Sequence, residues 1–524
     1  MSEAYVLAID LGTSGPKVVL LSVTGAQLAE EFEPVPLHLL PDDGGEQDPA
    51  DWWRAVVTAT RRLVARGLAP VEQIVGIGIT GQWAGMVPVD ETGKALGRAI
   101  LWMDARGVTQ IRSLMGGIPS ISGYGVVQLL RFLRITGGAP GLAGKDTLAH
   151  ILWLKAERPE LYARAAKLIE PIDWLAAQLC GRIATSYATV GLTWLADTRR
   201  IDDVRYHDRL LRRTGVDRSK LADLVPADTV LGPLTAAAAA ELGLSPTTQV
   251  VVGAPDIQAA AVGSGATRDY EAHYSLGTSA WLVCHLPKRK LDPLHNLATL
   301  PSGLPGRYIV VNEQESAAGS LTWLTRNVLW PKDAGREHNT PTDVHAELEQ
   351  LLLAAPPGSD GVLFTPWLCG ERTPVEDHAL RGGFANLSLR TEQRHLVRAV
   401  YEGVAFNGRW LLETVERLAG QELDPIRIVG GGARSDGWCQ VFADVWGRTI
   451  LRIDHPLGGT ARGAGLMAAC ALGYLDRADI PERVEVTSAF TPDPSLRAVY
   501  DHGYAAFRDL YRRNHSFFAR YGGH

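Results

Sequence analysis

The chain of 524 residues has few cysteines and no long hydrophobic run. Its five cysteines are odd in number, lie far apart and lack the spacing of metal ligands, so we expect buried thiols in a reducing compartment. No apolar stretch approaches the roughly 20 residues that a membrane helix requires. The N-terminus lacks the basic region and apolar stretch of a signal peptide. These absences predict a cytoplasmic protein.

The chain also lacks a strong excess of either charge. It has 52 basic and 58 acidic residues, a net charge of −6 without long runs of one sign. Nucleic acids and anionic membrane surfaces are bound mainly by basic patches. We therefore expect a small-molecule partner, with no nucleic acid and no membrane, and the composition leaves a homodimer open.

Length and the order of apolar patterns indicate two α/β domains. A single core usually stops growing at roughly 250 to 300 residues, about half of this chain. Strand-like and helix-like patterns alternate through both halves, which is typical of α/β layers. Helices are expected near 49–66, 316–329 and 391–418, and the glycine-rich segment 458–465 predicts the start of a closely packed helix. An alanine-rich helix expected at 235–242 ends at Gly243 and Pro246. We place the domain boundary there, which gives domains 1–245 and 246–524.

One tetrapeptide, Leu-Gly-Thr-Ser, occurs at Leu11–Ser14 and again at Leu276–Ser279. Each copy lies between two β-rich segments and predicts a hairpin. Glycine lets the backbone approach an anion, and the amides and hydroxyls of Thr and Ser donate to phosphate oxygens. The predicted phosphate-binding residues are Gly12, Thr13, Ser14, Gly277, Thr278 and Ser279. Asp10 precedes only the first copy, which predicts one magnesium position.

Two further segments permit more than one interpretation. Asp256 follows a predicted buried strand that begins at Gln249 and ends at Pro255, and it opens a helix of small residues. Taken alone, this pattern favours an ordinary helix N-cap. The run Gly430–Gly432 follows a short strand, but the third glycine of a dinucleotide-binding fingerprint is missing. An NAD-dependent oxidoreductase is therefore disfavoured.

Four motifs together resemble the FGGY family of carbohydrate kinases, and most of all its xylulokinase branch. They are Asp10-Leu-Gly-Thr-Ser-Gly15 with Lys17, Ser275-Leu-Gly-Thr-Ser279, Gly370-Glu-Arg-Thr-Pro374 and Gly430-Gly-Gly-Ala-Arg-Ser435. Their order and spacing agree with the family along nearly the whole chain. The resemblance implies two ribonuclease-H-like domains of the actin type with an active-site cleft between them. It also implies phosphorylation of a sugar or polyol with ATP and Mg²⁺.

The resemblance assigns roles to individual residues. Asp256 would be the catalytic base that accepts the proton of the attacking hydroxyl. Asp10 would hold the magnesium ion. Lys17 would reach the transferred phosphoryl group, although a lysine at a strand edge is more often solvated. The nucleotide would lie over Gly431, Gly432, Ala433 and Ser435.

The expected sugar site departs from the xylulokinase pattern. Ala84, in Gly81-Gln-Trp-Ala-Gly85, stands where the branch has histidine, and Ile257 stands where it has asparagine. Losing two hydroxyl-binding side chains should discriminate against substrates that need them. The predicted substrate contacts are Gln82, Trp83, Asp104 and Ile257, and Trp83 alternatively belongs to the core.

The expected function is thus a kinase for a pentulose-like sugar or polyol, deoxy or otherwise less polar than xylulose. Two alternatives remain open: a xylulokinase proper, and a non-catalytic nucleotide-dependent sensor or scaffold on the same fold. A second family signature, near Gly382–Leu387, has Asn386 in place of glycine. Asparagine tolerates a positive φ better than most residues, so we expect the turn to be retained.

Overall fold

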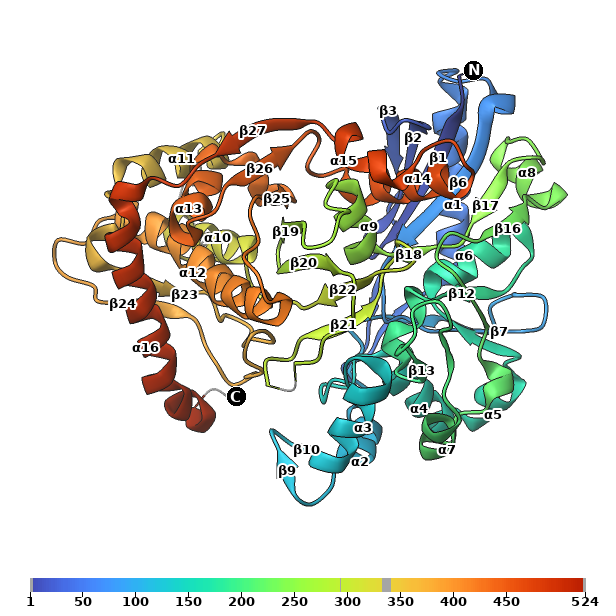
Figure 1. The fold of residues 1–524 in the computed structure, drawn as a ribbon, viewed down its shortest axis with the longest axis horizontal. Coiled ribbons are helices and arrows are strands. Elements are labelled where there is room, and N and C mark those ends of the chain that lie inside the picture. Colours follow the sequence, from blue (N-terminus) through green and yellow to red (C-terminus); the bar gives the residue numbers. More distant parts are fainter. Residues whose placement is uncertain (1–2, 293, 332–340, 522–524) are drawn as a thin grey trace.

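The computed structural model describes residues 3–292, 294–331 and 341–521, which form two lobes (Figure 1). Each lobe is built around a seven-stranded sheet covered by helices, and smaller sheets extend the first lobe. The predicted α/β class with two domains is confirmed.

The first sheet has the order β16-β17-β6-β1-β2-β3, with β18 also paired to β6. Its centre is the predicted hairpin, in which β1 (Tyr5–Gly12) pairs antiparallel with β2 (Gly15–Ser22). Strand β6 (Ile74–Gly81) runs parallel to β1. Nearly every residue of β1 and β6 is buried, because helices cover both faces of the sheet. The predicted helix that follows the hairpin is α1 (Pro49–Ala65), which Asp48 caps by accepting from Ala50 N.

The remaining elements of the first lobe follow in chain order. They are β3 (Gln27–Phe32), β4 (His38–Leu39), β5 (Gly45–Gln47), β7 (Val87–Val89), β8 (Ala99–Ile100), α2 (Val108–Met115), β9 (Ser120–Ile121), β10 (Tyr124–Gly125), α3 (Val126–Thr136), α4 (Thr147–Glu157), α5 (Pro159–Arg164), β11 (Lys167–Ile169), α6 (Pro171–Cys180), β12 (Ala184–Ser186), β13 (Ala196–Asp197), β14 (Arg205–Tyr206), α7 (Asp208–Thr214), β15 (Asp223–Val225), β16 (Val230–Pro233) and α8 (Ala236–Leu242). The alanine-rich helix expected at 235–242 is α8, capped by Thr235.

The strands that follow α8 still belong to the first sheet. Strand β17 (Gln249–Val251) pairs with β6 on one side and β16 on the other, and β18 (Ala254–Pro255) pairs with β6 as well. Helix α9 (Asp256–Gly263) then leaves this sheet, and β19 (Ala272–Leu276) begins the second. A boundary between α9 and β19 fits this pairing better than one at 245/246, because buried strands must complete their hydrogen bonds within one sheet.

The second sheet has the order β21-β22-β20-β19-β25-β26-β27. Its centre repeats the arrangement of the first: β19 and β20 (Ala280–Leu286) form the second predicted hairpin, and β25 (Ile426–Val429) runs parallel to β19. The remaining elements are β21 (Ala298–Pro301), β22 (Tyr308–Val311), α10 (Ala318–Leu324), α11 (Val344–Ala354), β23 (Leu363–Thr365), β24 (Gly383–Ala385), α12 (Gln393–Ala419), α13 (Asp436–Trp446), β26 (Ile450–Ile453), α14 (Gly459–Ala471), α15 (Ile480–Arg483), β27 (Val486–Phe490) and α16 (Arg497–Tyr521). The helix expected at 316–329 is α10, continued by a π-helical turn over Thr325–Leu329.

Two helices made of small residues pack where the lobes meet. Helix α14 belongs late in the chain, yet it lies on β1 and β6 of the first sheet and against α9 (Figure 1). A Cβ built on Gly463 would lie 1.8 Å from Ala259 O, and one on Gly263 would lie 1.7 Å from Gly459 O. Only glycine permits this approach of the two backbones. The start of a closely packed helix that the pattern at 458–465 predicts is confirmed.

The turn that carries Asn386 is retained as expected, since Asn386 has a φ of 63°. Its amide also donates to Gly361 O at 3.0 Å, which holds the left-handed conformation. The substitution of glycine by asparagine in this family signature is therefore compatible with the fold.

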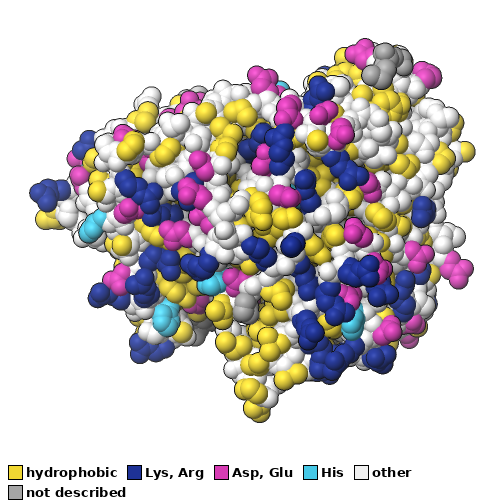
Figure 2. All heavy atoms as spheres, viewed as in Figure 1, with side chains coloured by type: hydrophobic (Ala, Val, Ile, Leu, Met, Phe, Trp, Pro, Cys, Tyr) yellow, Lys and Arg dark blue, Asp and Glu magenta, His cyan; other side chains and the backbone are white. Residues whose placement is uncertain are grey.

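The surface carries both charges intermixed, as Figure 2 shows for one face. Apolar side chains gather at the lower tip of that face, over the hairpin β9–β10 and the start of α3. Exposed apolar residues of this region include Ile118, Ile121, Val127 and Leu130. Within residues 3–292, 294–331 and 341–521, no helix is long and apolar enough to cross a membrane.

Candidate active site

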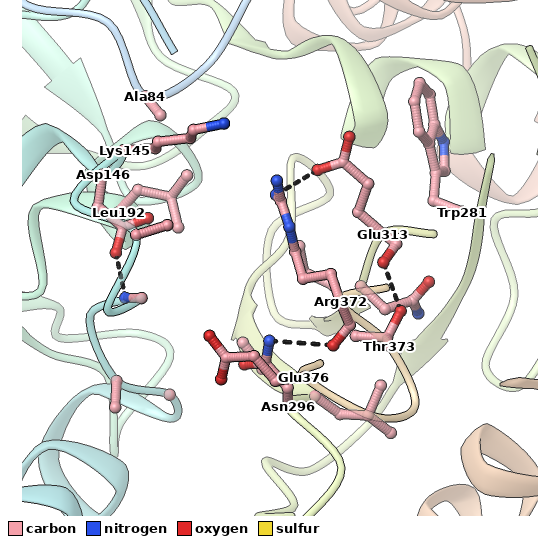
Figure 3. Close-up of a pocket in the computed structure, with 18 of the residues that line it drawn as sticks. Ala84, Lys145, Asp146, Leu192, Trp281, Asn296, Glu313, Arg372, Thr373 and Glu376 are labelled. Atoms are coloured by element: carbon pink, nitrogen blue, oxygen red, sulfur yellow. Dashed lines mark hydrogen bonds and ion pairs between the residues drawn. The ribbon is translucent and has the colours of Figure 1, made fainter. Parts of the chain in front are cut away.

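A cavity of about 520 Å³ lies between the two lobes, and both contribute to its walls (Figure 3). Six of the residues predicted from the sequence line it: Thr13, Gln82, Trp83, Asp256, Ile257 and Ser279. They come from separate parts of the chain, from the first hairpin to the second. The structure therefore brings the predicted phosphate, base and sugar positions to one place.

The two Leu-Gly-Thr-Ser turns face the cavity through one residue each. In the first turn, Thr13 Oγ1 accepts from Trp102 Nε1 at 3.0 Å, and Thr13 O accepts from Gln47 Nε2 at 2.7 Å. In the second, Thr278 O accepts from Ala317 N at 2.8 Å, so the start of α10 packs on the turn. Ser279 lines the cavity from this side. Four predicted phosphate contacts do not line the cavity: Gly12, Ser14, Gly277 and Thr278. Ser14 and Thr278 are exposed.

Asp10 and Asp256 lie at the carboxyl ends of two parallel strands, β1 and β18, that flank β6. Asp10 pairs with Thr80 of β6, and Thr80 in turn pairs with Ala254 of β18, two residues before Asp256. The carboxyl ends of parallel strands are where α/β proteins usually bind ligands. This register explains why two acidic residues far apart in sequence come together.

The local geometry of Asp256 differs from the simple cap interpretation. Pro255 is the N-cap of α9, and Asp256 is the first helical residue. Its Oδ1 accepts from Ile257 N at 2.7 Å. Burial raises the pKa of Asp256 to about 7, and the negative charge of Asp10 adds to the rise. A carboxyl with a pKa near neutrality is suited to accept a proton.

Asp10 does not line the cavity, but its surroundings are compatible with the predicted magnesium role. Burial raises its pKa to about 6, the Lys17 charge opposes this rise, and no hydrogen bond contributes to it. Magnesium in kinase sites usually binds one or two carboxylates together with phosphate oxygens, so a single such carboxylate beside a phosphate turn fits it. The described residues contain no group of three or more His, Cys, Asp or Glu side chains that could hold a metal by themselves. Lys17 does not line the cavity, and its Nζ donates to Leu457 O at 3.5 Å.

The glycine run after β25 packs against the second phosphate turn. A Cβ on Gly430 would lie 2.6 Å from Leu276 O, and one on Gly432 would lie 2.4 Å from Leu276 Cγ. A Cβ on Gly431 would meet nothing within 4 Å, so its surface is open to a ligand. The other two predicted nucleotide contacts have structural partners: Ala433 is fully buried, and Ser435 caps α13 by accepting from Trp438 N at 3.0 Å.

On the sugar side, Trp83 is a core residue that also lines the cavity, and its contact with a substrate stays a prediction. Its indole is 7% exposed and Nε1 donates to Thr189 O at 2.8 Å, as expected of a core residue. Its ring nevertheless forms part of the cavity wall together with Ala84 and Ile257. Ala84 has a φ of 62°, a left-handed conformation that alanine seldom adopts. Gln82 also lines the wall, and its Oε1 is buried without a hydrogen-bond partner.

The structure does not bring Asp104 to the cavity. Its side chain is 1% exposed, and its carboxylate accepts from Gly45 N at 3.0 Å and Arg106 Nη2 at 2.7 Å. These bonds anchor the loop that presents Trp102, two residues earlier, to the cavity. The assignment of Asp104 as a substrate contact is therefore replaced by a supporting role behind Trp102.

Several charged residues of the cavity were not identified from the sequence. They are Lys145, Asp146, Asp292, Glu313 and Glu376, and Arg372 of the motif Gly370–Pro374 lines the cavity with them. Burial raises the pKa of Asp146 to about 6. A lone lysine in a glycine-rich loop follows no periodicity, so nothing in the sequence marked Lys145 as a cavity residue.

Comparisons with known proteins agree with this geometry. The N-terminal and C-terminal domain models of the FGGY family of carbohydrate kinases match residues 5–263 and 272–472. The chain is 28% identical over 511 residues to the xylulose kinase of Bacillus subtilis (strain 168), covering 97% of this chain and 96% of that protein. It is 25% identical over 496 residues to the gluconokinase of the same organism, covering 93% and 92%. The crystal structure of a xyloylose kinase from Brucella ovis superposes with a TM-score of 0.86 at 28% identity, covering 98% and 99%. The chain belongs to the FGGY family of carbohydrate kinases.

Proposed function

We propose that this kinase transfers the γ-phosphoryl group of ATP to a hydroxyl of a small, pentulose-like sugar or polyol, with Asp256 as the catalytic base. The observation that supports this most is the position of Asp256 beside Asp10, on a cavity that both phosphate turns border. Phosphoryl transfer needs little covalent chemistry from the protein, and mainly positioning and charge stabilisation. The cavity offers both.

The proposed reaction is a single displacement. The substrate hydroxyl transfers its proton to Asp256 as its oxygen attacks the γ-phosphorus, and the bond to the β-phosphate oxygen breaks to release ADP. Thr13 and Ser279 position the phosphates from opposite lobes, and Asp10 would hold a magnesium ion that neutralises phosphate charge. Lys17 points toward the loop before α14, and it would approach the phosphates only if the lobes close.

The adenosine is proposed to lie on the glycine run after β25. The open face of Gly431 supports this, because a side chain there would occupy the ligand's space. Gly432, Ala433 and Ser435 shape the same loop through their packing and capping contacts. We infer that the two lobes close over both substrates, which excludes water before transfer.

The sugar side supports a substrate that has a less polar edge. Trp83, Ala84 and Ile257 form an apolar wall where a xylulokinase would offer hydroxyl-binding side chains. Apolar carbon surface is favoured against such a wall, and unpaired hydroxyls are not. The xylulose kinases among the relatives make D-xylulose the principal alternative substrate.

The alternative of a non-catalytic nucleotide-dependent scaffold is less well supported. A protein that only binds nucleotide has no need of a buried carboxyl with a pKa near 7, because burying that carboxyl costs stability. The structure contains such a carboxyl at the expected position of the base.

A coupled assay of ADP release with MgATP tests the proposal directly. We expect turnover with at least one member of a panel of ketoses, alditols and deoxysugars, and none when EDTA removes magnesium. Purified, folded protein that consumes ATP with no member of the panel would contradict the kinase assignment to this class of substrate.

The pH profile tests the base. Because Asp256 must be ionised to accept a proton, kcat/KM for the sugar should fall as the pH drops through the pKa of Asp256. In the ligand-free protein the pKa of Asp256 is about 7, and a bound magnesium ion would favour the ionised form. The inflection of kcat/KM is therefore expected between about pH 5 and 7. The KM for MgATP, measured over the same range, controls for nucleotide binding. A profile that is flat from pH 5 to 9 would rule out this assignment.

A further inference from the structure

We propose that Lys145 and Glu313, from opposite walls of the cavity, bind neighbouring hydroxyl groups of the substrate, and that this pair selects a neutral sugar or polyol over a sugar acid. The inference rests on the proposed function and deepens it. Neither residue belongs to the motifs that identify the family. Both line the cavity that contains Asp256, and both are drawn in Figure 3.

The loop before α4 holds Lys145 in place. Asp146, the next residue, accepts from Gly141 N at 2.6 Å and from Trp194 Nε1 at 2.9 Å. Gly144, the preceding residue, has a φ of 71°, and a Cβ on it would lie 2.3 Å from Val108 N. The backbone on both sides of Lys145 is therefore fixed, and the long side chain extends into the cavity (Figure 3).

A buried carboxylate links this loop to the wall of Ala84. Glu170 accepts from Gly85 N at 2.9 Å, and its other oxygen accepts from the hydroxyl of Thr147. The segment carrying Ala84 and the segment carrying Lys145 are thus parts of one hydrogen-bonded unit. Ala84 stands where a xylulokinase-like site has a hydroxyl-binding histidine, and Lys145 supplies a donor from the same wall.

On the opposite wall, Glu313 belongs to an ion-pair cluster. Arg372 Nη1 pairs with Glu313, and Arg372 Nη2 lies 2.7 Å from Glu315 Oε1. Glu371 holds Arg372 in position, because its buried carboxylate accepts from Asn407 Nδ2 at 2.6 Å and from Arg372 N at 2.9 Å. Arg372 is therefore occupied. Glu313 also accepts a side-chain hydrogen bond from Ser279. Because an ionised carboxylate has about four acceptor positions, Glu313 keeps acceptor capacity toward the cavity.

Lys145 is the cation that remains available to a ligand. No hydrogen bond or ion pair within 4 Å joins its ammonium group to any residue in the described parts of the chain, and its charge acts on Glu313 across the cavity. An ammonium group has three donors and no acceptor, whereas an ionised carboxylate only accepts. A hydroxyl can do both, so a pair of neighbouring hydroxyls satisfies Lys145 and Glu313 together.

The charge of the site favours a neutral substrate. The cavity wall carries two basic side chains, Lys145 and Arg372. Five carboxyl groups face them: Asp146, Asp256, Asp292, Glu313 and Glu376. A substrate carboxylate would add an uncompensated negative charge beside Asp146 and the base. Like charges in a cavity of low dielectric repel strongly. The site should therefore discriminate against aldonates, the class of substrate that a gluconokinase uses.

The test compares wild type, Lys145→Met, Lys145→Arg and a matched control, Lys94→Met. Lys94 is exposed on a turn of the same lobe, outside the cavity. With the best neutral substrate, Lys145→Met should raise the KM for that substrate by about 10-fold to 100-fold, as expected for a lost hydrogen bond from a charged group. The kcat and the KM for MgATP should change by less than about 3-fold, and Lys145→Arg should recover part of the loss.

A second measurement compares two substrates on the wild-type protein, so it does not depend on whether the Lys145 variants fold. For wild type, kcat/KM should be higher for an alditol than for the aldonate of the same length, and Glu313→Gln should narrow that ratio because it removes a negative charge. A wild-type preference for the aldonate, or a Lys145→Met variant with unchanged KM, would overturn the inference. If no sugar turns over, the proposed function fails. The inference about Lys145 is then tested by calorimetric titration of an alditol into wild type and into Lys145→Met. Equal binding to both proteins, or no binding to either, overturns the inference.

Discussion

Replacing Asp256 by Asn is expected to lower kcat by about 100-fold to 10,000-fold, the usual contribution of a positioned general base. Asparagine has nearly the same shape, and its side-chain oxygen can still accept from Ile257 N, but it cannot take up the proton of the substrate hydroxyl. The KM for MgATP should remain close to that of wild type, because Asp256 is proposed to contact the sugar and not the nucleotide. Steady-state kinetics with the best substrate of the screen measure both quantities.

The same substitution should make the ligand-free protein slightly more stable at high pH. The folded-state pKa of Asp256, about 7, lies above its ordinary value of 3.8. The folded state therefore binds the proton more tightly than the unfolded state, and stability is lost as the pH rises from about 4 through 7. Asparagine has no such dependence, so at pH 8 its thermal midpoint should exceed that of wild type by roughly 2 °C.

Asp203→Asn is the matched control, since Asp203 is partly exposed, lies outside the cavity and pairs only loosely with Arg205, at 3.9 Å. It should keep wild-type turnover and show no gain in stability. Turnover by Asp256→Asn within 10-fold of wild type would show that another group acts as the base.

Gly463→Ala is expected to destabilise the protein by about 3 kcal/mol or more, at the upper end of what overpacking costs. The added methyl would lie 1.8 Å from the carbonyl oxygen of Ala259, a backbone atom that cannot rotate away as a side chain can. In an exposed helix, glycine to alanine normally stabilises by up to about 1 kcal/mol. The sign of the effect therefore reports directly on the contact between α9 and α14.

Thermal or urea unfolding measures this change, and Gly383→Ala is the control. A Cβ on Gly383 would meet nothing within 4 Å, and its φ is not in the left-handed region, so its midpoint should stay near that of wild type. Because α9 begins with Asp256, the folded fraction of Gly463→Ala should also turn over more slowly. A midpoint at or above that of wild type would mean that the two helices are farther apart than described.

Local patterns in the sequence predicted much of this molecule correctly. The two hairpins, the helix that begins at Asp256 and the long helix over Gln393–Ala419 depend on neighbouring residues, through alternation, small turn residues and helical periodicity. The family motifs lie on these same elements. A pattern confined to a short stretch of chain can be recognised from that stretch alone, without the rest of the sequence.

The domain boundary and Asp104 show where such patterns fail. An alanine-rich helix followed by Gly243 marks the end of an element, but β17 and β18 pair with β6 because its edge is open to them. Asp104 has the residue type of a sugar contact, yet Gly45 and Arg106 satisfy its carboxylate. Both outcomes depend on partners that are distant in the chain.

The sequence by itself determined the fold class and the kinase family, and it singled out the residues proposed as the base, the magnesium ligand and the phosphate contacts. Each of these is carried by a short motif whose residues are neighbours in the chain. Only the tertiary structure decided which of those residues face the cavity, that Asp10 and Asp256 share their burial and charge, and that Lys145 and Glu313 face each other across it. Cavity walls and shifted pKa values arise from tertiary contacts between side chains that are distant in the chain. No local pattern of residues specifies those contacts. The repeated Leu-Gly-Thr-Ser predicts the phosphate-binding turns, whereas the proposed sugar site is formed only where the two lobes meet.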